Sequence, residues 1–96
     1  MNMKEYYSMY LTLHQNKICR RLHVLGQLCT IAWIVCCVFF KIYFLLLLTP
    51  FIVYPFAWSG HYFFEKNKPA AFKDPMKAKI ADWIMLFDII TGKIPF

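Results

Sequence analysis

The three histidines are the residues of this 96-residue chain best suited to chemistry, because imidazole binds metal ions and titrates near neutral pH. Imidazole nitrogen suits iron, zinc and copper, and three protein ligands leave positions open for other molecules. Cys19 together with His14 would form a mixed set suited to zinc, although "HQNKICRRLH" lacks zinc-finger spacing. A histidine beside an apolar segment can equally be an anchor at a membrane surface. Spacing alone therefore leaves both interpretations open for His14, His23 and His61.

Two long apolar runs must position these histidines. Residues 22–40 and 42–58 contain no Asp, Glu, Lys or Arg. Helices of these lengths rise about 28 and 26 Å, close to the hydrocarbon thickness of a bilayer. We therefore predict a membrane hairpin of two spans that turns at Lys41, with the second span kinked by Pro50 and Pro55. A cleaved signal peptide is excluded because the second span follows the first at once.

The hairpin brings distant histidines to one depth. His23 lies eighteen residues before Lys41 and His61 lies twenty residues after it, so their depths differ by only about 3 Å. His14 would be about 13 Å from His23 along a straight helix, too far to share an ion. A turn at residues 15–17 would fold the N-terminal segment back over the open end of the hairpin, where His23 and His61 lie. The spacing thus predicts that the three imidazoles converge on one side of the membrane.

Helices lying at the membrane surface are expected on both sides of the hairpin. Tyrosines and leucines near the N-terminus recur at helical spacing, which predicts an interfacial helix with its tyrosines at headgroup depth. Asp74 followed by Pro75 predicts the start of a C-terminal helix of about sixteen residues, and Gly92 predicts its end. Asp82 and Asp88 interrupt its apolar stretch, so we expect an amphipathic or re-entrant helix. The fold class predicted is all-α.

The distribution of basic residues predicts the topology. Four of the eleven Lys and Arg residues precede the first span, six follow the second, and only Lys41 lies between. The positive-inside rule then places both termini in the cytoplasm, at the inner membrane of a bacterium or the endoplasmic reticulum of a eukaryote. Anionic headgroups account for the net charge of +6, so we expect no nucleic-acid partner. The chain forms one domain, residues 1–96, whose broad apolar faces favour a homo-oligomer.

Two carboxylates are further candidates for a site. Glu65 follows His61 by one helical turn, and can complete a histidine-plus-carboxylate set for ferrous iron, orient an imidazole, or pair with a nearby cation. Asp82 is the carboxylate deepest in the apolar part of the last helix. It is a functional candidate for that reason, although an ion pair with Arg20 or Arg21 would explain it equally well.

Three stretches together resemble a known family: "YLTLHQNKICRRLHVLG", "WSGHYFFEKNKPAAF" and "ADWIMLFDIITGK". They are similar to the Mpo-like family of small membrane proteins, whose characterised members are Fe(II)-dependent dioxygenases of 2-hydroxy fatty acids. The most specific part is "GHYFFEKNKPA", followed by Phe72 and Pro75. Gln27 departs from the family pattern, in which threonine is common.

The resemblance implies a membrane-embedded enzyme that oxidises a long-chain 2-hydroxy fatty acid with dioxygen to a product one carbon shorter. It implies His14, His23 and His61 as Fe(II) ligands, with Glu65 and Asp82 as catalytic candidates beside them. The acyl tail would lie in the bilayer, and we expect the polar head to be bound by Arg20, Arg21, Asn67 and Lys68.

Two functions from other classes also fit the residues. One is a non-catalytic membrane scaffold or lipid-binding protein whose histidines only anchor it at the interface. The other is a zinc-dependent lipid hydrolase. Bound metal separates the scaffold from the enzymes, and a requirement for dioxygen separates the dioxygenase from the hydrolase.

Overall fold

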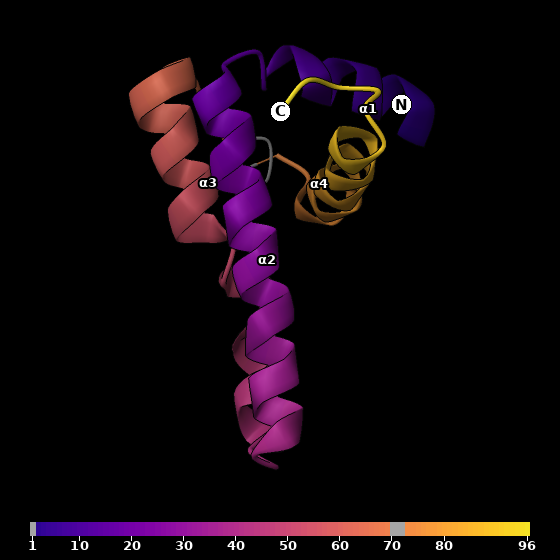
Figure 1. The fold of residues 1–96 in the computed structure, drawn as a ribbon. Coiled ribbons are helices and arrows are strands. Elements are labelled where there is room, and N and C mark those ends of the chain that lie inside the picture. The colour runs from indigo at the N-terminus through magenta and orange to yellow at the C-terminus, as the bar shows by residue number, and fades with distance from the viewer. Residues whose placement is uncertain (1, 70–72) are drawn as a thin grey trace.

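The computed structural model describes residues 2–69 and 73–96, and these residues form helices and no β-strand (Figure 1). The prediction of an all-α fold is confirmed. Ala70 and Phe72 of the motif above lie outside the described residues. In chain order the elements are α1 (Met3–Thr12), α2 (Lys17–Phe39), the 3-10 segment η1 (Tyr43–Phe51), α3 (Tyr54–Gly60), the π-helical segment η2 (His61–Glu65) and α4 (Pro75–Ile90).

The hairpin is formed by α2 and by the helical segments that follow it back along its length (Figure 1). Lys41 makes the turn with a left-handed backbone, φ 58°. The helix α2 begins at Lys17, five residues before the apolar run, because the side chain of Asn16 caps it by accepting from the Ile18 amide. The turn into α2 therefore follows His14 directly, as the spacing predicted.

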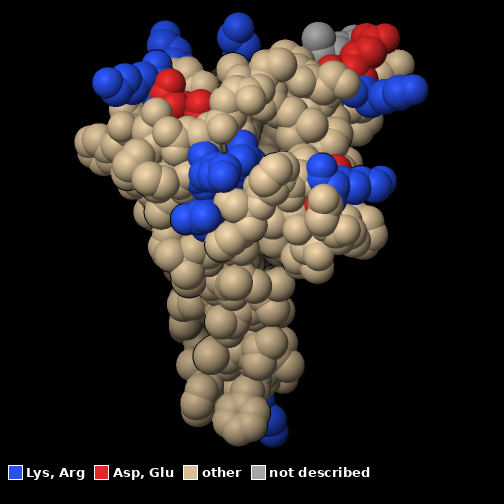
Figure 2. All heavy atoms as spheres, turned by 45° about the horizontal axis from the view of Figure 1, so that its top comes forward, with Lys and Arg blue, Asp and Glu red and all other residues tan. Residues whose placement is uncertain are grey.

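Two 23-residue helical segments, Lys17–Phe39 and Tyr43–Glu65, are long and apolar enough to cross a membrane. The residues from 22 to 64 include one charged side chain, Lys41 at the tip. Figure 2 shows the consequence: Lys, Arg, Asp and Glu gather at the broad end, and the narrow stem is uncharged down to its tip. This distribution matches a stem in hydrocarbon and a broad end at the headgroups.

The second segment is helical but irregular because of its prolines. Pro50 lies inside η1 and Pro55 lies in the first turn of α3, and neither residue has an amide hydrogen to donate. The Pro50 carbonyl instead accepts a hydrogen bond from the Lys79 ammonium, which also lies 4.5 Å from the centre of the Tyr54 ring. The helix α4 is thus attached to the hairpin at Pro50.

Two glycines let the antiparallel segments approach closely near the broad end. A Cβ on Gly26 would lie 2.9 Å from Val53 Cγ2, and a Cβ on Gly60 would lie 2.8 Å from Cys19 Sγ and 3.1 Å from Cys19 Cα. Gly60 immediately precedes His61. The close approach therefore sets how near His61 comes to α2.

We predict that Gly60→Ala lowers the Tm, although Gly→Ala inside a helix normally stabilises by up to about 1 kcal/mol. Overpacking against the Cys19 backbone costs about 1–3 kcal/mol and outweighs that gain. The measurement is thermal unfolding in detergent, with Ser59→Ala as the control, since the Ser59 hydroxyl only bonds Pro55 within its own helix. A Tm at or above that of the wild type would contradict the close approach.

The helices α1 and α4 pack on each other and cover the broad end of the hairpin (Figure 1). Asp74 caps α4 by accepting from the Lys77 amide, with Pro75 as the first helical residue, as predicted. The α1–α4 core consists of Tyr6, Tyr10, Ala78, Ala81 and Met85. Tyr6 and Tyr10 therefore point inward against α4, and the depth of the α1 tyrosines in the membrane stays a prediction.

Candidate metal centre

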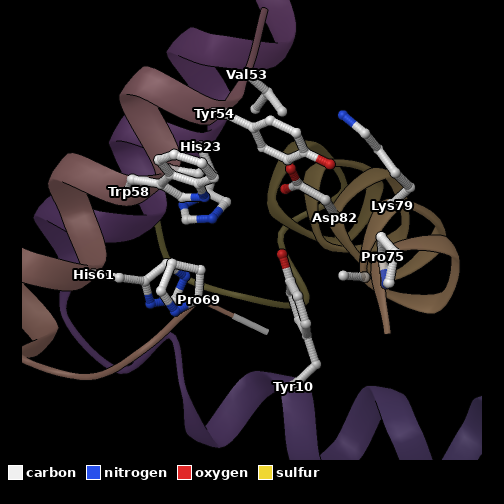
Figure 3. A pocket seen from close by; sticks show the side chains of 12 residues that line it. Tyr10, His23, Val53, Tyr54, Trp58, His61, Pro69, Pro75, Lys79 and Asp82 are labelled. Atoms are coloured by element: carbon white, nitrogen blue, oxygen red, sulfur yellow. The ribbon is translucent and has the colours of Figure 1, made fainter. Parts of the chain in front are cut away.

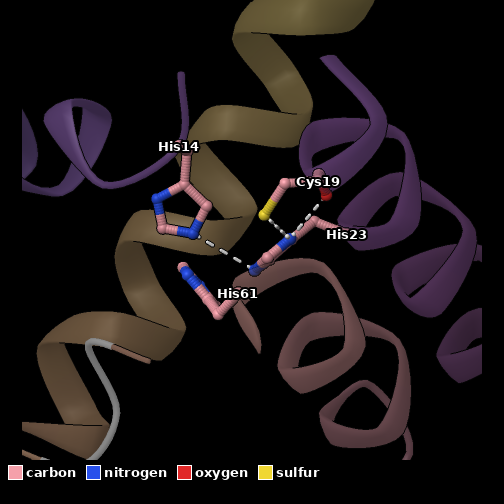
Figure 4. Close-up of side chains that lie close together, drawn as sticks. All are labelled: His14, Cys19, His23 and His61. Carbon is pink, nitrogen blue, oxygen red and sulfur yellow. Dashed lines mark hydrogen bonds between the residues drawn. The ribbon is translucent and has the colours of Figure 1, made fainter. Parts of the chain in front are cut away.

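The three histidines come from three different elements and meet in one buried cluster (Figure 4). His14 lies in the turn between α1 and α2, His23 lies on α2, and His61 opens η2. Their ring centres are 4.5–5.2 Å apart, and each side chain is 2–3% exposed. The predicted convergence is confirmed.

Each ring is held through its Nδ1 atom. His14 Nδ1 is 2.7 Å from the Tyr10 carbonyl and His23 Nδ1 is 2.9 Å from the Cys19 carbonyl. His61 Nδ1 is 2.6 Å from Asn67 Oδ1, whose amide group is oriented by donation from Nδ2 to the Leu13 carbonyl. Because all three partners are acceptors, each Nδ1 carries the hydrogen and each Nε2 carries a lone pair.

Two lone pairs that face each other, on Nε2 of His14 and of His23, indicate a site for a cation. The Nε2 atoms of His14 and His23 are 3.2 Å apart, with no hydrogen to share. Two nitrogens bound to one ion at about 2.1 Å are about 3.0 Å apart at an octahedral angle and about 3.4 Å apart at a tetrahedral angle. The observed separation falls within that range, so the residues fit a metal ion.

Protonation of His14 would also relieve the two facing lone pairs, but burial disfavours it. Burial is the main cause that lowers the pKa of His14 to about 2, and the charge of His23 lowers it further. The hydrogen bond to the Tyr10 carbonyl raises the pKa but does not offset burial. His14 is therefore neutral at any physiological pH, as a metal ligand must be.

Cys19 is the fourth member of the cluster. One nitrogen from each histidine and the Cys19 Sγ all lie within 4.8 Å of one another, and all four residues are buried. Among the described residues these form the group of side chains that could hold a metal ion.

Glu65 and Arg20 lie beside the cluster and fix the turn that carries His14. The Glu65 carboxylate accepts from the Asn16 amide at the start of α2, where the helix dipole favours a negative charge. Arg20 Nη1 donates to the carbonyls of His14 and Gln15, both at 2.9 Å. Glu65 is not a member of the cluster, and its predicted catalytic role stays a prediction.

The residues expected to bind the substrate head have partners within the protein or line another hollow. Arg20 and Arg21 also donate to the carbonyls of Pro95 and Phe96, each at 3.1 Å. Lys68 lines a separate hollow of about 300 Å³ between α1 and the segment before α4. Their substrate-binding roles, like that of Asn67, stay predictions.

Asp82 is paired with Gln27 rather than with an arginine. Gln27 Nε2 donates to Asp82 Oδ2 at 2.6 Å, and both side chains are buried. Burial raises the pKa of Asp82 to about 7, against the opposing effects of the Gln27 hydrogen bond, the Lys79 charge and the Tyr10 hydroxyl. Asp82 can therefore take up or release a proton near neutral pH.

We predict that Asp82→Asn raises stability at alkaline pH. An acid with a raised pKa stabilises the fold below pH 3.8, its usual value, and loses that contribution as the pH rises to about 7. At pH values near 8 the Tm of the variant should exceed that of the wild type by about 5 °C or more. Each unit by which folding raises the pKa of the acid lowers the stability of the ionised protein by about 1.4 kcal/mol, and a loss of that size shifts the Tm by several degrees. Near pH 4 the two proteins should differ least. Parallel Tm curves from acid to alkaline pH would contradict the raised pKa.

A cavity of about 30 Å³ connects Asp82 to the histidines. His23 and His61 line one side of it, with Asp82 and Tyr10 across from them (Figure 3). A space of this size holds one or two water-sized molecules. A diatomic molecule or a small polar group would fill it, and a long apolar chain does not fit inside it.

Sequence reasoning missed two of the residues that build this centre. Tyr10 stacks on His14 with ring centres 4.0 Å apart, a contact that the helical spacing of the tyrosines did not predict. Gln27 was noted only as a departure from a family pattern. The missed signal is a polar stripe at helical spacing along the apolar α2, formed by the buried residues Cys19, His23, Gln27 and Thr30.

Comparison with known proteins gives one result. A family model described as "2-hydroxy-palmitic acid dioxygenase Mpo1-like" matches residues 1–94. No curated protein and no solved structure matches the chain.

Proposed function

The chain belongs to the Mpo1-like family, and from that membership we propose that it is a membrane-embedded Fe(II)-dependent dioxygenase of 2-hydroxy fatty acids. The family description supports the substrate class. One observation supports the metal above all others: two lone-pair nitrogens, on His14 and His23, face each other at 3.2 Å in a buried site.

In this proposal His14, His23 and His61 hold the metal through Nε2. Bound Fe(II) supplies one-electron chemistry with dioxygen and a site that orients the 2-hydroxy acid. The carbonyls of Tyr10 and Cys19 and the amide of Asn67 keep each ring in the tautomer that binds. Burial keeps bulk water out of the centre.

The reaction proposed breaks the bond between C1 and C2 of the acid. One 2-hydroxy acid and one dioxygen give the acid one carbon shorter, carbon dioxide and water, so dioxygen takes up the four electrons that the two carbons lose. Asp82 faces the histidines across the cavity and is the group we propose to exchange a proton with the substrate hydroxyl. Lys79, which also lines the cavity, favours a carboxylate there.

The membrane placement proposed follows from the charge pattern. The stem spans the bilayer, both termini and the metal centre lie on the cytoplasmic side, and the acyl chain enters from the lipid along the stem. Self-association through the apolar faces of the stem stays a prediction.

The test is turnover of 2-hydroxypalmitate by anaerobically purified protein. We expect activity only when Fe(II) and dioxygen are both supplied, with one dioxygen consumed for each shortened acid and labelled oxygen recovered in the products. Lipid hydrolysis that proceeds with zinc and without dioxygen would instead establish the hydrolase. Stoichiometric Fe(II) binding without turnover of any 2-hydroxy acid would reject the proposed reaction.

A further inference from the structure

Cys19 lies inside the histidine cluster, yet the proposed function does not use its thiol. The side chain is 0% exposed, and its Sγ is 3.8 Å from His23 Nδ1. Figure 4 shows the thiol directed into the space between His14 and His23. One nitrogen of each of the three histidines lies within 4.8 Å of the sulfur.

We propose that Cys19 is a fourth ligand that the centre uses for zinc-type ions but not for Fe(II) in the active state. This inference rests on the proposed three-histidine site. Imidazole nitrogen and thiolate sulfur are the ligands of closed tetrahedral zinc sites, and thiolate favours soft ions. As the ion binds, the S–H bond breaks, the S–metal bond forms, and the proton passes to solvent.

The distances between the Cys19 sulfur and the histidine nitrogens are close to those of a four-ligand site. In a tetrahedral site with zinc bonds of about 2.3 Å to sulfur and 2.1 Å to nitrogen, a sulfur and a nitrogen lie about 3.6 Å apart. One ring nitrogen of each histidine and the Cys19 Sγ lie within 4.8 Å of one another, and the Sγ is 3.8 Å from Nδ1 of His23, the nitrogen of that ring that does not face the ion. Closure therefore requires the Sγ to turn about χ1 of Cys19 toward the Nε2 atoms, and the rings to tilt toward it. Gly60 leaves the space that Sγ occupies, since a Cβ there would be 2.8 Å away.

Zinc bound in this way would inhibit the enzyme. A closed set of three imidazoles and one thiolate fills the coordination sphere and leaves no position for substrate. Zinc binds N and S ligands more tightly than Fe(II) does. The thiol would therefore raise the affinity of the centre for zinc, which competes with Fe(II) for the same histidines. Cys19 thereby sets the metal preference of the centre.

The experiment uses Co(II) as a spectroscopic probe for zinc in the full chain. The wild type should show the intense visible bands of tetrahedral Co(II) and a near-ultraviolet thiolate-to-cobalt charge-transfer band. Cys19→Ser should bind Co(II) through its histidines without the charge-transfer band. The control is the triple variant C29S/C36S/C37S, which removes the cysteines of α2 outside the cluster and should keep that band.

Competition between zinc and Fe(II) gives a second readout. Cys19→Ser should lower the ratio of zinc affinity to Fe(II) affinity about 10- to 100-fold. A loss of metal affinity of this size is found even when the side chain removed only hydrogen-bonds to a metal ligand. Co(II) binding without a charge-transfer band in the wild type, or a band that persists in Cys19→Ser, would overturn the inference and leave the three-histidine site intact. Failure of the wild type to bind any of these ions would overturn both.

Discussion

Replacing His14, His23 or His61 by alanine is expected to remove bound metal in each case. Each ring supplies one of three nitrogens. Removing a residue that only hydrogen-bonds to a metal ligand typically lowers metal affinity about 10- to 100-fold, and removing a ligand itself should lower it further. We therefore expect Fe(II) affinity to fall more than about 100-fold and turnover to be lost with it. Metal analysis after anaerobic loading and desalting measures the effect.

Two controls separate loss of a ligand from loss of the fold. Gln15→Ala changes an exposed neighbour of His14 and should retain full metal content. Added imidazole should restore part of the binding in the alanine variants, because it can fill the space left by the ring. Full metal content in all three alanine variants would show that the histidines only pack together.

The second large effect is expected at Asn67, which orients His61 without being a metal ligand. Asn67→Ala removes the acceptor from His61 Nδ1 and the donor to the Leu13 carbonyl. The ring can then turn or change tautomer, so metal affinity and kcat should fall about 10- to 100-fold. The measurements are an Fe(II) titration and steady-state kinetics at saturating metal.

Asn67→Asp is the comparison variant, since it keeps an acceptor for His61 Nδ1, loses the donor to the Leu13 carbonyl and adds a negative charge beside the ring. It should retain more metal than Asn67→Ala. An Asn67→Ala variant with unchanged metal affinity and a raised KM would contradict the orienting role and favour direct contact with substrate.

The meeting of the histidines was predictable because it depends on helix rise and one turn. His23 and His61 lie eighteen and twenty residues from Lys41, and a hairpin of any tilt returns them to the same depth. The turn predicted at residues 15–17 is present, and within it the side chain of Asn16 caps the start of α2. The start of α4 at Asp74 and Pro75 followed from the same kind of local signal.

The contacts that orient the rings were not predictable from spacing. Asn67 reaches His61 because η2 has a π-helical turn and Lys66 then adopts a left-handed backbone with φ 58°. Lysine has no preference for that conformation, so the sequence carries no sign of it. The pairing of Gln27 with Asp82 likewise depends on how α4 packs against α2, which no local pattern specifies.

X-ray absorption at the iron edge of anaerobically loaded wild-type protein tests most directly whether the three histidines bind one ion. We expect one Fe(II) per chain with three imidazole ligands. A spectrum that requires one imidazole or none would contradict a shared ion among His14, His23 and His61.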